Sequence, residues 1–333
     1  MPMVPMKQIL DGAARGHYGV GAYNVNNMEQ LQGIMKAARE TNSPVIIQAS
    51  RGALRYTNLV YLKHLMMAAV EDNPDIKIAL HLDHGDKLET VKTAIELGFT
   101  SVMIDGSLKE DGKTPRSFEE NAEITKQVVD YAHQFGVTVE GELGTLGGIE
   151  EDVAASQVLL TDPQEAKKFV EYTGVDALAV AIGTSHGAYK FKAEPKLALD
   201  IVEQIHRLVP ELAIVMHGSS SVPQELVDKV NRYGGKLPGA KGVPIESIQA
   251  AIKLGVRKIN VDTDSRLAMT AAIRQVFVEK PERFDPRDYL GPGREAIAEL
   301  IKSKMIAFGT AGHNSDYEPK TLEDMRKLYA SKR

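Results

Sequence analysis

The 333-residue chain contains no cysteine, and this absence removes several kinds of chemistry at once. Without a thiol there is no disulfide, no cysteine nucleophile and no thiolate ligand for a metal. Long stretches of one charge sign are also missing, and the formal net charge is only −5. The sequence therefore has no concentration of positive charge of the kind that binds nucleic acid or an anionic membrane surface.

Long apolar stretches are absent as well. No run approaches the roughly 18 apolar residues that identify a membrane-spanning helix. The opening MPMVPMKQIL also lacks the charged and apolar regions of a signal peptide. We therefore expect a cytoplasmic protein with no membrane or nucleic-acid partner. Apolar residues nevertheless make up 43% of the chain, which is enough for a large hydrophobic core.

Eight short apolar segments alternate with segments of helical periodicity along the chain. Near-continuous apolar strands separated by helices are typical of a parallel sheet that is covered on both faces. Eight such units predict a (β/α)8 barrel. The expected strands are residues 19–25, 44–50, 76–84, 100–105, 137–143, 176–183, 212–218 and 256–262.

The segment after the first expected strand illustrates the helical signal. Leu31, Ile34 and Met35 have the spacing of one buried helix face. Asn27 followed three residues later by Gln30 predicts the N-terminal cap of this helix. We therefore expect the helix to start just after Asn27.

An internal sequence similarity and the C-terminal region indicate how the domain is organised. Residues 94–105 and 251–262 share Ala, Ile, Leu, Gly and a final Asp at matching places, as repeated helix-turn-strand units would. After Asp264 no further strand is apparent. We interpret residues 1–333 as a single barrel domain in which 265–333 is a mainly helical C-terminal extension.

Polar residues gather at the C-terminal ends of the expected strands. In a parallel barrel these ends all open on one face, where barrel active sites lie. A lone histidine there is more often a hydrogen-bonded core residue, but three together predict a metal site with zinc as the metal. Asp105 and Glu142 could hold a second cation or orient the histidines. His81 is interpreted as a core or supporting residue. The three candidate ligands are His84, His186 and His217.

Two strand ends favour a phosphate. The segment HGSSSVP places Gly218 and three serines before a helix that is expected to start near Pro223. Free backbone N–H groups at a helix start bind anions. The segment NVDTDSR provides a similar set after the last strand, and barrel phosphate sites commonly follow strands seven and eight. Each segment alone could be an ordinary helix cap, but together they favour a phosphorylated ligand.

A glycine-rich segment, GELGTLGGIEEDVAASQ, follows the fifth expected strand. Its glycines would allow the loop to close over a ligand, and Glu150 or Glu151 could then act as a base. An exposed acidic loop explains the same residues equally well.

Five motifs in fixed order carry a family resemblance. HLDHG, VEGELG, GTSHGAYK, VMHGSSSVP and INVDTD together resemble the class II, metal-dependent fructose-1,6-bisphosphate aldolases. The segments GVGAYNVNNMEQ and SPVIIQAS fit this family too, and the resemblance extends from about residue 7 to 313. QASRGA, FDPRDYL and FGTAGH resemble the class IIB branch, which includes the Calvin-cycle type.

The resemblance implies the reaction and the metals. The reaction would be reversible cleavage of fructose 1,6-bisphosphate to dihydroxyacetone phosphate and glyceraldehyde 3-phosphate through a zinc-stabilised enediolate. A monovalent cation, Na+ or K+, would lie near the carbonyls of Gly187 and Gly218. Asp105 and Glu142 would match the second divalent position of the family. The implied zinc ligands are His84, His186 and His217.

The resemblance also implies the proton carriers. Asp83 would be the acid/base on the C4 oxygen. The loop after GELG is shorter here than in many Calvin-cycle relatives, which leaves the base that acts at carbon open between Glu150 and Glu151. Glu151 is the weakly favoured candidate, because a closing loop can bring in either one.

Substrate-binding residues are implied in the same way. Ser50 would meet the aldehyde half of the sugar. Arg287, in FDPRDYL, would bind the C6 phosphate in the site of a neighbouring subunit, since a guanidinium matches phosphate; a surface arginine is an equally good interpretation. The chain would then form a homodimer or homotetramer. The residues assigned to dihydroxyacetone phosphate and the rest of the substrate are Gly187, Lys190, Gly218, Ser219, Ser220, Asn260, Val261, Asp262 and Thr263.

Other functions stay open at this point. A tagatose-1,6-bisphosphate aldolase differs only in the stereochemistry at C4, and a metal-dependent sugar-phosphate epimerase also uses histidines and carboxylates in a barrel. A Schiff-base aldolase needs a lysine that projects into the barrel, for which Lys258 is the candidate. A non-catalytic scaffold would leave the clustered histidines unexplained.

Overall fold

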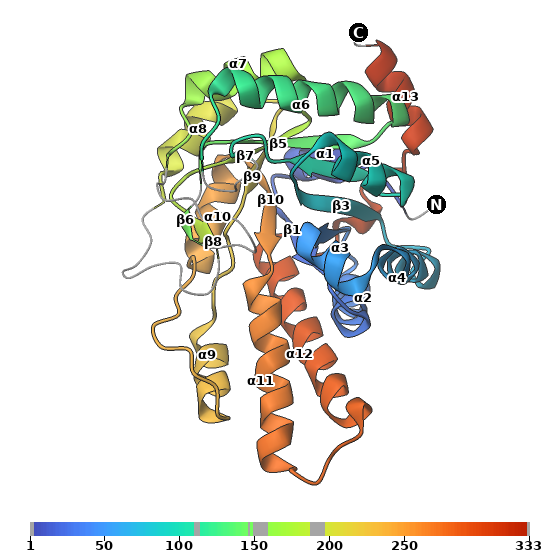
Figure 1. Ribbon diagram of the computed structural model, residues 1–333, viewed down its shortest axis with the longest axis vertical. Coiled ribbons are helices and arrows are strands. Elements are labelled where there is room, and N and C mark those ends of the chain that lie inside the picture. Colours follow the sequence, from blue (N-terminus) through green and yellow to red (C-terminus); the bar gives the residue numbers. More distant parts are fainter. Residues whose placement is uncertain (1–2, 110–113, 146, 149–158, 187–196, 332–333) are drawn as a thin grey trace.

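The computed structural model describes residues 3–109, 114–145, 147–148, 159–186 and 197–331. Eight parallel strands form a closed barrel, and helices surround it (Figure 1). The order around the barrel is β1-β10-β9-β7-β5-β4-β3-β2, so the first and last strands pair with each other and close it. The expected (β/α)8 barrel with additional C-terminal helices is confirmed.

All eight expected strands are present, with bounds that differ from the expectation by a few residues at most. A further pair of short strands, β6 (Gly147–Gly148) and β8 (Ser185–His186), forms a separate two-stranded sheet. The barrel strands are β1 (Val20–Asn24), β2 (Val45–Ser50), β3 (Ile78–Gly85), β4 (Ser101–Ile104), β5 (Thr138–Leu143), β7 (Ala177–Val180), β9 (Ala213–Met216) and β10 (Val256–Val261).

Every barrel strand is followed along the chain by at least one helix. In this order α11 takes the position of the eighth barrel helix; α1 before the first strand, a second helix after β2 and after β9, and α12 and α13 at the C-terminal end are additional to the barrel pattern. The helices are α1 (Met6–Gly16), α2 (Met28–Thr41), α3 (Arg51–Thr57), α4 (Leu59–Asp72), α5 (Leu88–Glu96), α6 (Phe118–Ala132), α7 (Pro163–Thr173), α8 (Leu199–Leu208), α9 (Gln224–Arg232), α10 (Ile245–Leu254), α11 (Thr263–Glu279), α12 (Pro286–Ala307) and α13 (Leu322–Ser331).

The hydrophobic core has one part outside the sheet and one part inside it. Outside, strand residues such as Ile47 and Ile259 belong to a large cluster that includes the inner faces of the helices. Inside, small residues leave room for α1, whose Met6, Ile9 and Leu10 are buried in the same cluster as the barrel alanines. Each such side chain stabilises the fold by about 1.5–3 kcal/mol when fully buried. Helix α1 therefore closes the end of the barrel at which the strands begin.

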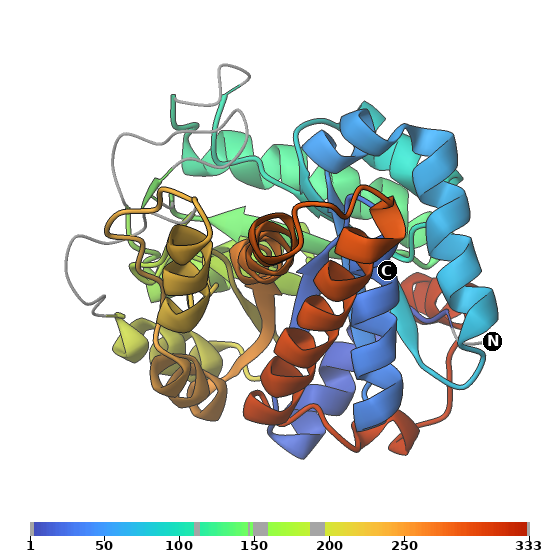
Figure 2. The same cartoon turned by 90° about the horizontal axis from the view of Figure 1, so that it is seen from below.

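Helices α11 and α12 form a hairpin that projects away from the barrel (Figure 1). Seen along the other direction, α12 lies beside α2, and it also packs against α11 (Figure 2). The connection between α11 and α12 carries Phe284, whose side chain is largely exposed. Although these helices are long, no helix within the described ranges has both the length and the apolar character needed to cross a membrane.

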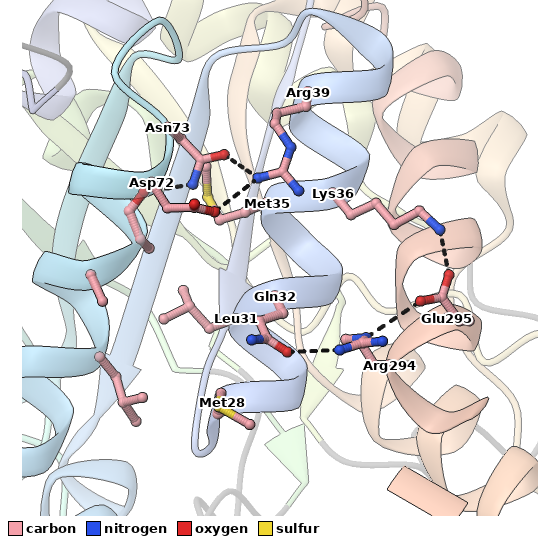
Figure 3. Close-up of a pocket in the computed structure, with 13 residues that line it drawn as sticks. Met28, Leu31, Gln32, Met35, Lys36, Arg39, Asp72, Asn73, Arg294 and Glu295 are labelled. Atoms are coloured by element: carbon pink, nitrogen blue, oxygen red, sulfur yellow. Dashed lines mark hydrogen bonds and ion pairs between the residues drawn. The ribbon is translucent and has the colours of Figure 1, made fainter. Parts of the chain in front are cut away.

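A groove of about 590 Å³ lies in the helical layer between α2, α4 and α12 (Figure 3). Leu31 and Met35 contribute to its apolar lining. At its rim, the guanidinium of Arg39 lies 3.4 Å from the carboxylate of Asp72. None of the strand-end residues predicted to be functional lines this groove.

The start of α2 gives a test of local stability. Oδ1 of Asn27 accepts the N–H of Gln30 at 3.0 Å, which confirms the predicted cap. We predict that Asn27→Ala lowers the free energy of unfolding by about 1 kcal/mol. Asn27→Ser keeps a hydroxyl acceptor and should lose much less. Urea unfolding followed by circular dichroism measures both, and equal losses in the two variants would contradict the assigned cap.

Candidate active site

The end of β3 is distorted so that two adjacent side chains reach the same place. Successive residues of a regular strand point to opposite faces. His84, however, has φ 52°, and the pairing of β3 with β4 shifts register between Leu82 and Gly85. This left-handed conformation costs a non-glycine residue about 1–3 kcal/mol. As a result, ligand atoms of Asp83, His84 and His217 lie within 4.8 Å of one another.

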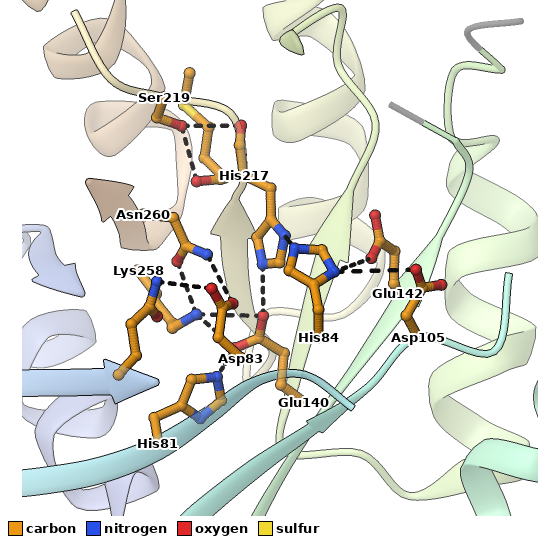
Figure 4. A network of polar contacts seen from close by, with 12 residues as sticks. His81, Asp83, His84, Asp105, Glu140, Glu142, His217, Ser219, Lys258 and Asn260 are labelled. Atoms are coloured by element: carbon orange, nitrogen blue, oxygen red, sulfur yellow. Dashed lines mark hydrogen bonds and ion pairs between the residues drawn. The ribbon is translucent and has the colours of Figure 1, made fainter. Parts of the chain in front are cut away.

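His84 and His217 face each other at the barrel mouth (Figure 4). Nδ1 of His217 lies 3.1 Å from Nε2 of His84. On the other side of the His84 ring, Nδ1 lies 3.9 Å from a carboxylate oxygen of Asp105 and 3.9 Å from one of Glu142. The structure thus brings together four of the five predicted metal residues. The backbone of His186 lies in β8, and its side chain is outside the described part of the chain.

Negative charge dominates around His84. Burial alone would lower the pKa of His84, but the carboxylates of Asp83, Asp105 and Glu142 raise it to about 9. Burial, together with the nearby Asp105 carboxylate, raises the pKa of Glu142 well above its ordinary value. His84 and Glu142 therefore both hold a proton more tightly than usual, which is the behaviour expected where a cation would be stabilised.

The donor set fits a divalent cation. Oε2 of Glu142 is buried and has no hydrogen-bond partner among the described residues. Leaving a buried polar atom unpaired costs about 1–3 kcal/mol, and a cation would satisfy it. Burial and the nearby positive His84 hold the pKa of His217 well below its ordinary value, so its ring is neutral and can offer a lone pair. Imidazole nitrogens with carboxylate oxygens are the ligands of catalytic zinc sites.

Glu140 of β5 orients the His217 ring from inside the barrel. Its Oε1 lies 2.8 Å from Nε2 of His217, which leaves Nδ1 facing the cluster. Carboxylates in this position fix the orientation of metal-binding histidines. Nζ of Lys258 lies 3.0 Å from Oε2 of Glu140, and His81 lies 3.5 Å from the same oxygen. None of these four side chains has exposed surface.

Asp83 is surrounded by amide groups that can only donate to it. Nδ2 of Asn24 and Nε2 of Gln48 both donate to Oδ2 of Asp83 at 3.1 Å. Nδ2 of Asn260 donates to Oδ1 at 3.3 Å. The Lys258 ammonium, which has no acceptor, donates to Oδ1 of Asn260 at 2.8 Å and so fixes which end of that amide faces Asp83.

These contacts keep Asp83 ionised. Burial alone would raise the pKa of Asp83, but the positive charges of His84 and Lys258 bring it below its ordinary value. A carboxylate oxygen has two lone pairs, and Oδ1 accepts one of the three amide hydrogen bonds named above. Asp83 therefore retains the capacity to accept a proton from a ligand in the barrel mouth.

A second part of the mouth is formed by the turn after β9 and the start of α11. Oγ of Ser220 accepts the N–H of Asp262 at 3.2 Å and ties the two segments together. Ser219 and Ser220 are buried, and their own N–H groups have no acceptor among the described residues. Helix α11 begins next to them, at Thr263. Unpaired N–H groups beside a helix start are the usual elements of an anion site.

Gly218 is required by the geometry of this turn. Its φ is 58°, and a Cβ built on it would lie 2.6 Å from the carbonyl oxygen of Ser185. Any side chain would therefore separate the turn from β8, whose first residue is Ser185. Among its neighbours, Ser219 directs its hydroxyl inward, where it donates to the carbonyls of Met216 and His217.

The remaining predicted residues divide into those near the mouth and those outside it. Ser50 caps α3 by accepting the N–H of Ala53, and it lies beside Asp83 in the register of β2 and β3. Arg287 lies in the first turn of α12, next to the far end of the hairpin, with its side chain 89% exposed and paired with Asp285. A single chain therefore does not bring Arg287 to the mouth. Predicted residues that fall outside the described ranges are Glu150, Glu151, Gly187 and Lys190.

Several residues of the site were not predicted to act there. Glu140 contacts the predicted ligand His217, and Asn24 and Gln48 contact the predicted base Asp83. Lys258 contacts both Glu140 and Asn260 and so connects the two groups. Strand alternation gave a usable signal, because Glu140 is two residues before Glu142 and Lys258 two residues before Asn260. Each of these pairs shares a strand face, so alternation alone indicates that the earlier member also points into the barrel.

Comparison with known proteins gives a consistent result. Residues 4–313 match the family described as class II fructose-bisphosphate aldolase. A fructose-bisphosphate aldolase of Giardia intestinalis is 62% identical over 331 residues, which cover 99% of this chain and 100% of that protein. One from Nostoc sp. is 51% identical, covering 99% and 96%. The crystal structure of the YdjI aldolase from Escherichia coli K12 matches with a TM-score of 0.75 at 30% identity, covering 94% and 100%.

The contact between Glu140 and His217 generates a prediction about metal affinity. Glu140→Gln keeps the size of the side chain but removes the charge that orients His217. We expect zinc to bind about 10–100-fold more weakly. Competition with a chromophoric chelator gives the dissociation constant, and Glu203→Gln on the surface of α8 is the control. An unchanged constant in Glu140→Gln would refute the supporting role of this carboxylate.

Proposed function

This chain belongs to the class II fructose-bisphosphate aldolase family, and we propose that its barrel mouth reversibly cleaves fructose 1,6-bisphosphate. The products are dihydroxyacetone phosphate and glyceraldehyde 3-phosphate. The observation that carries the proposal is the position of Asp83 beside the facing rings of His84 and His217 (Figure 4). Breaking the C3–C4 bond needs a base at the C4 hydroxyl and an electrophile at the neighbouring ketone, and both must be within reach of one substrate.

His84, His186 and His217 are the residues that would hold the divalent metal, which we propose is zinc. When bound, zinc supplies a positive charge that polarises the ketone oxygen. Asp105 and Glu142 would serve a second divalent cation. We also propose a monovalent cation near the carbonyls of Gly187 and Gly218.

Asp83 moves the proton at the C4 oxygen. In cleavage it accepts the hydroxyl proton as the C3–C4 bond breaks, and in condensation it returns this proton to the aldehyde oxygen. The donors Asn24, Gln48 and Asn260 hold the carboxylate in one orientation, so that its remaining lone pair faces the mouth.

The proton at carbon requires a second carrier. We propose Glu151, with Glu150 as the alternative, on the segment after β6. Both residues lie outside the described ranges, so the proposal depends on their place in the sequence, in a glycine-rich segment between β5 and α7. A loop carboxylate can approach the substrate when the loop closes and can leave again with the product.

The N–H groups of Ser219 and Ser220, which find no acceptor within the part of the chain that the structure describes, support a phosphate site beside the start of α11. This phosphate would be the one on dihydroxyacetone phosphate. Ser50 would contact the aldehyde half. The other residues proposed to bind the substrate are Gly187, Lys190, Gly218, Asn260, Val261, Asp262 and Thr263.

The assembly and setting of the enzyme are also part of the proposal. Arg287 lies on the projecting hairpin, where it could reach the C6 phosphate only in the site of another subunit of a homodimer or homotetramer. We propose a cytoplasmic enzyme. Its 333 residues would form one domain, with 265–333 as a helical extension of the barrel.

Two alternatives concern the sugar or the reaction. A tagatose 1,6-bisphosphate substrate would place the C4 hydroxyl differently, and a sugar-phosphate epimerase would break no carbon–carbon bond. Schiff-base chemistry is disfavoured, because Lys258 is fully buried and its ammonium is ion-paired with Glu140 at 3.0 Å. A lysine held in this way has no free lone pair for attack on a carbonyl.

Metal removal tests the class of mechanism. We predict that the metal-free protein loses nearly all cleavage of fructose 1,6-bisphosphate, and that added zinc restores it. Borohydride with substrate should not inactivate the enzyme, because no imine forms. Metal analysis of each sample is the necessary control. Full activity in protein shown to be metal-free would overturn the proposed function.

The two proton transfers can be separated by mutation. We predict that Asp83→Ala lowers cleavage of fructose 1,6-bisphosphate by about 10²–10⁴-fold. It should still exchange the α-proton of dihydroxyacetone phosphate with solvent, because that step uses the other carrier. Glu151→Gln and Glu150→Gln test that carrier, and one of them should lose exchange. NMR in heavy water measures it; undiminished exchange in the double loop variant would exclude both carboxylates.

A further inference from the structure

The side chain of Asp264, the second residue of α11, contacts the turn after β9. It is fully buried. Oδ2 accepts the N–H of Ser221 at 2.9 Å and its hydroxyl at 3.1 Å, and Oδ1 accepts the N–H of Val222 at 2.7 Å. Val222 has φ 48°, a conformation that is exceptional for a β-branched residue. The carboxylate thus holds the turn in a shape that its own sequence does not favour.

The charge of Asp264 is balanced from the C-terminal helices. Lys304 of α12 is only 3% exposed. Its Nζ lies 2.8 Å from Oδ2 of Asp264 and donates to Oγ of Ser221 at 2.5 Å. A buried carboxylate without such a partner is strongly unfavourable. The conformation of the turn therefore depends on a residue that is far from it in sequence.

On one side the turn after β9 is not covered by closely packed protein. A surface cavity of about 660 Å³ lies there, and its wall includes Ser221, Val222 and Lys304. The Val222 side chain packs in a small apolar cluster with Val227 and Leu267, but the polar side of the turn borders the cavity. On this side the N–H of Val243 donates to the carbonyl of Ser220 at 3.1 Å and Nε2 of Gln224 donates to the carbonyl of Val222 at 3.1 Å, while the pair between Lys304 and Asp264 supplies the charged contact.

We propose that Lys304 is a positioning residue for the phosphate of the substrate and that it acts through Asp264. With Lys304 present, the turn can offer the N–H groups of Ser219 and Ser220 to an anion without an uncompensated negative charge behind them. Without Lys304, the Asp264 carboxylate would repel a phosphate that carries up to two negative charges. This inference rests on the proposed function, and it gives α12 a part in a site that the barrel strands otherwise build.

A double-mutant cycle on Lys304 and Asp264 tests the proposal. We expect Lys304→Met to raise the KM for fructose 1,6-bisphosphate about 10–100-fold and to weaken binding of dihydroxyacetone phosphate similarly, with little change in kcat. Adding Asp264→Asn should recover about tenfold of this loss, because the amide is uncharged, its oxygen still accepts the N–H of Val222 and its NH2 can donate to Oγ of Ser221, with only the N–H of Ser221 losing its acceptor. Lys302→Met is the matched control on the same helix, since Lys302 is half-buried, away from the turn, and pairs with Glu40.

A second substrate distinguishes positioning from a loss of stability. Fructose 6-phosphate lacks the C1 phosphate, so its cleavage should be affected much less by Lys304→Met. The ratio of kcat/KM for the two sugars should therefore fall about 10–100-fold in this variant. A variant that is merely less folded would lose activity on both sugars equally. If Lys304→Met does not fold, Lys304→Gln serves the same test, because its amide can donate to Asp264 without carrying a charge.

The outcomes separate this inference from the proposed function. If the wild-type holoenzyme cleaves neither sugar, the proposed function fails. If the wild type cleaves fructose 1,6-bisphosphate but the folded variant keeps the wild-type KM and sugar ratio, the positioning role of Lys304 is refuted and the proposed function stands. Isothermal calorimetry with dihydroxyacetone phosphate and zinc-loaded protein gives the affinity without relying on turnover.

Discussion

The ion pair between Lys258 and Glu140 is the contact on which the rest of the site depends. Two opposite charges lie 3.0 Å apart with no exposed surface, and neither could remain buried without the other. Each partner also has a second task. Glu140 orients His217 on the metal side, and Lys258 orients Asn260, which in turn donates to Asp83. A single pair in the barrel interior therefore fixes both the proposed metal ligands and the proposed base, although it belongs to neither group.

Two of the five described non-glycine residues with positive φ lie where the barrel contributes chemistry. Left-handed backbone at His84 allows adjacent residues to share the mouth, and left-handed backbone at Val222 shapes the turn beside the start of α11. Each conformation is unfavourable by about 1–3 kcal/mol. Each is held by surrounding contacts, namely the bulged pairing of β3 with β4 and the hydrogen bonds to Asp264. The barrel core, sealed by α1, supplies the stability that offsets this strain.

The sequence was a good guide to the strands and to the side chains at their ends. Apolar segments of strand length predicted all eight barrel strands, and parallel topology explained why His84, Asp105, Glu142 and His217 would meet. It was a poor guide to contacts set by barrel register and backbone distortion. No local pattern showed that β3 would bulge, that Lys258 would pair with Glu140, or that Lys304 would reach Asp264. Arg287, which was expected either to act in a neighbouring subunit's site or to be a surface residue, projects away from the mouth of its own chain, and its role stays a prediction.

The closure of the barrel by β1 and β10 has a consequence for synthesis on the ribosome. Strand β1 lies near the start of the chain, and its partner β10 comes after most of the other elements. Helix α2 likewise waits for α12, which packs beside it. At about 5–20 residues per second, the interval between these partners is on the order of tens of seconds. During that time the nascent chain presents an unpaired strand edge and an uncovered apolar helix face. Strand β1 and helix α2 emerge early and must therefore remain protected until β10 and α12 have been synthesised.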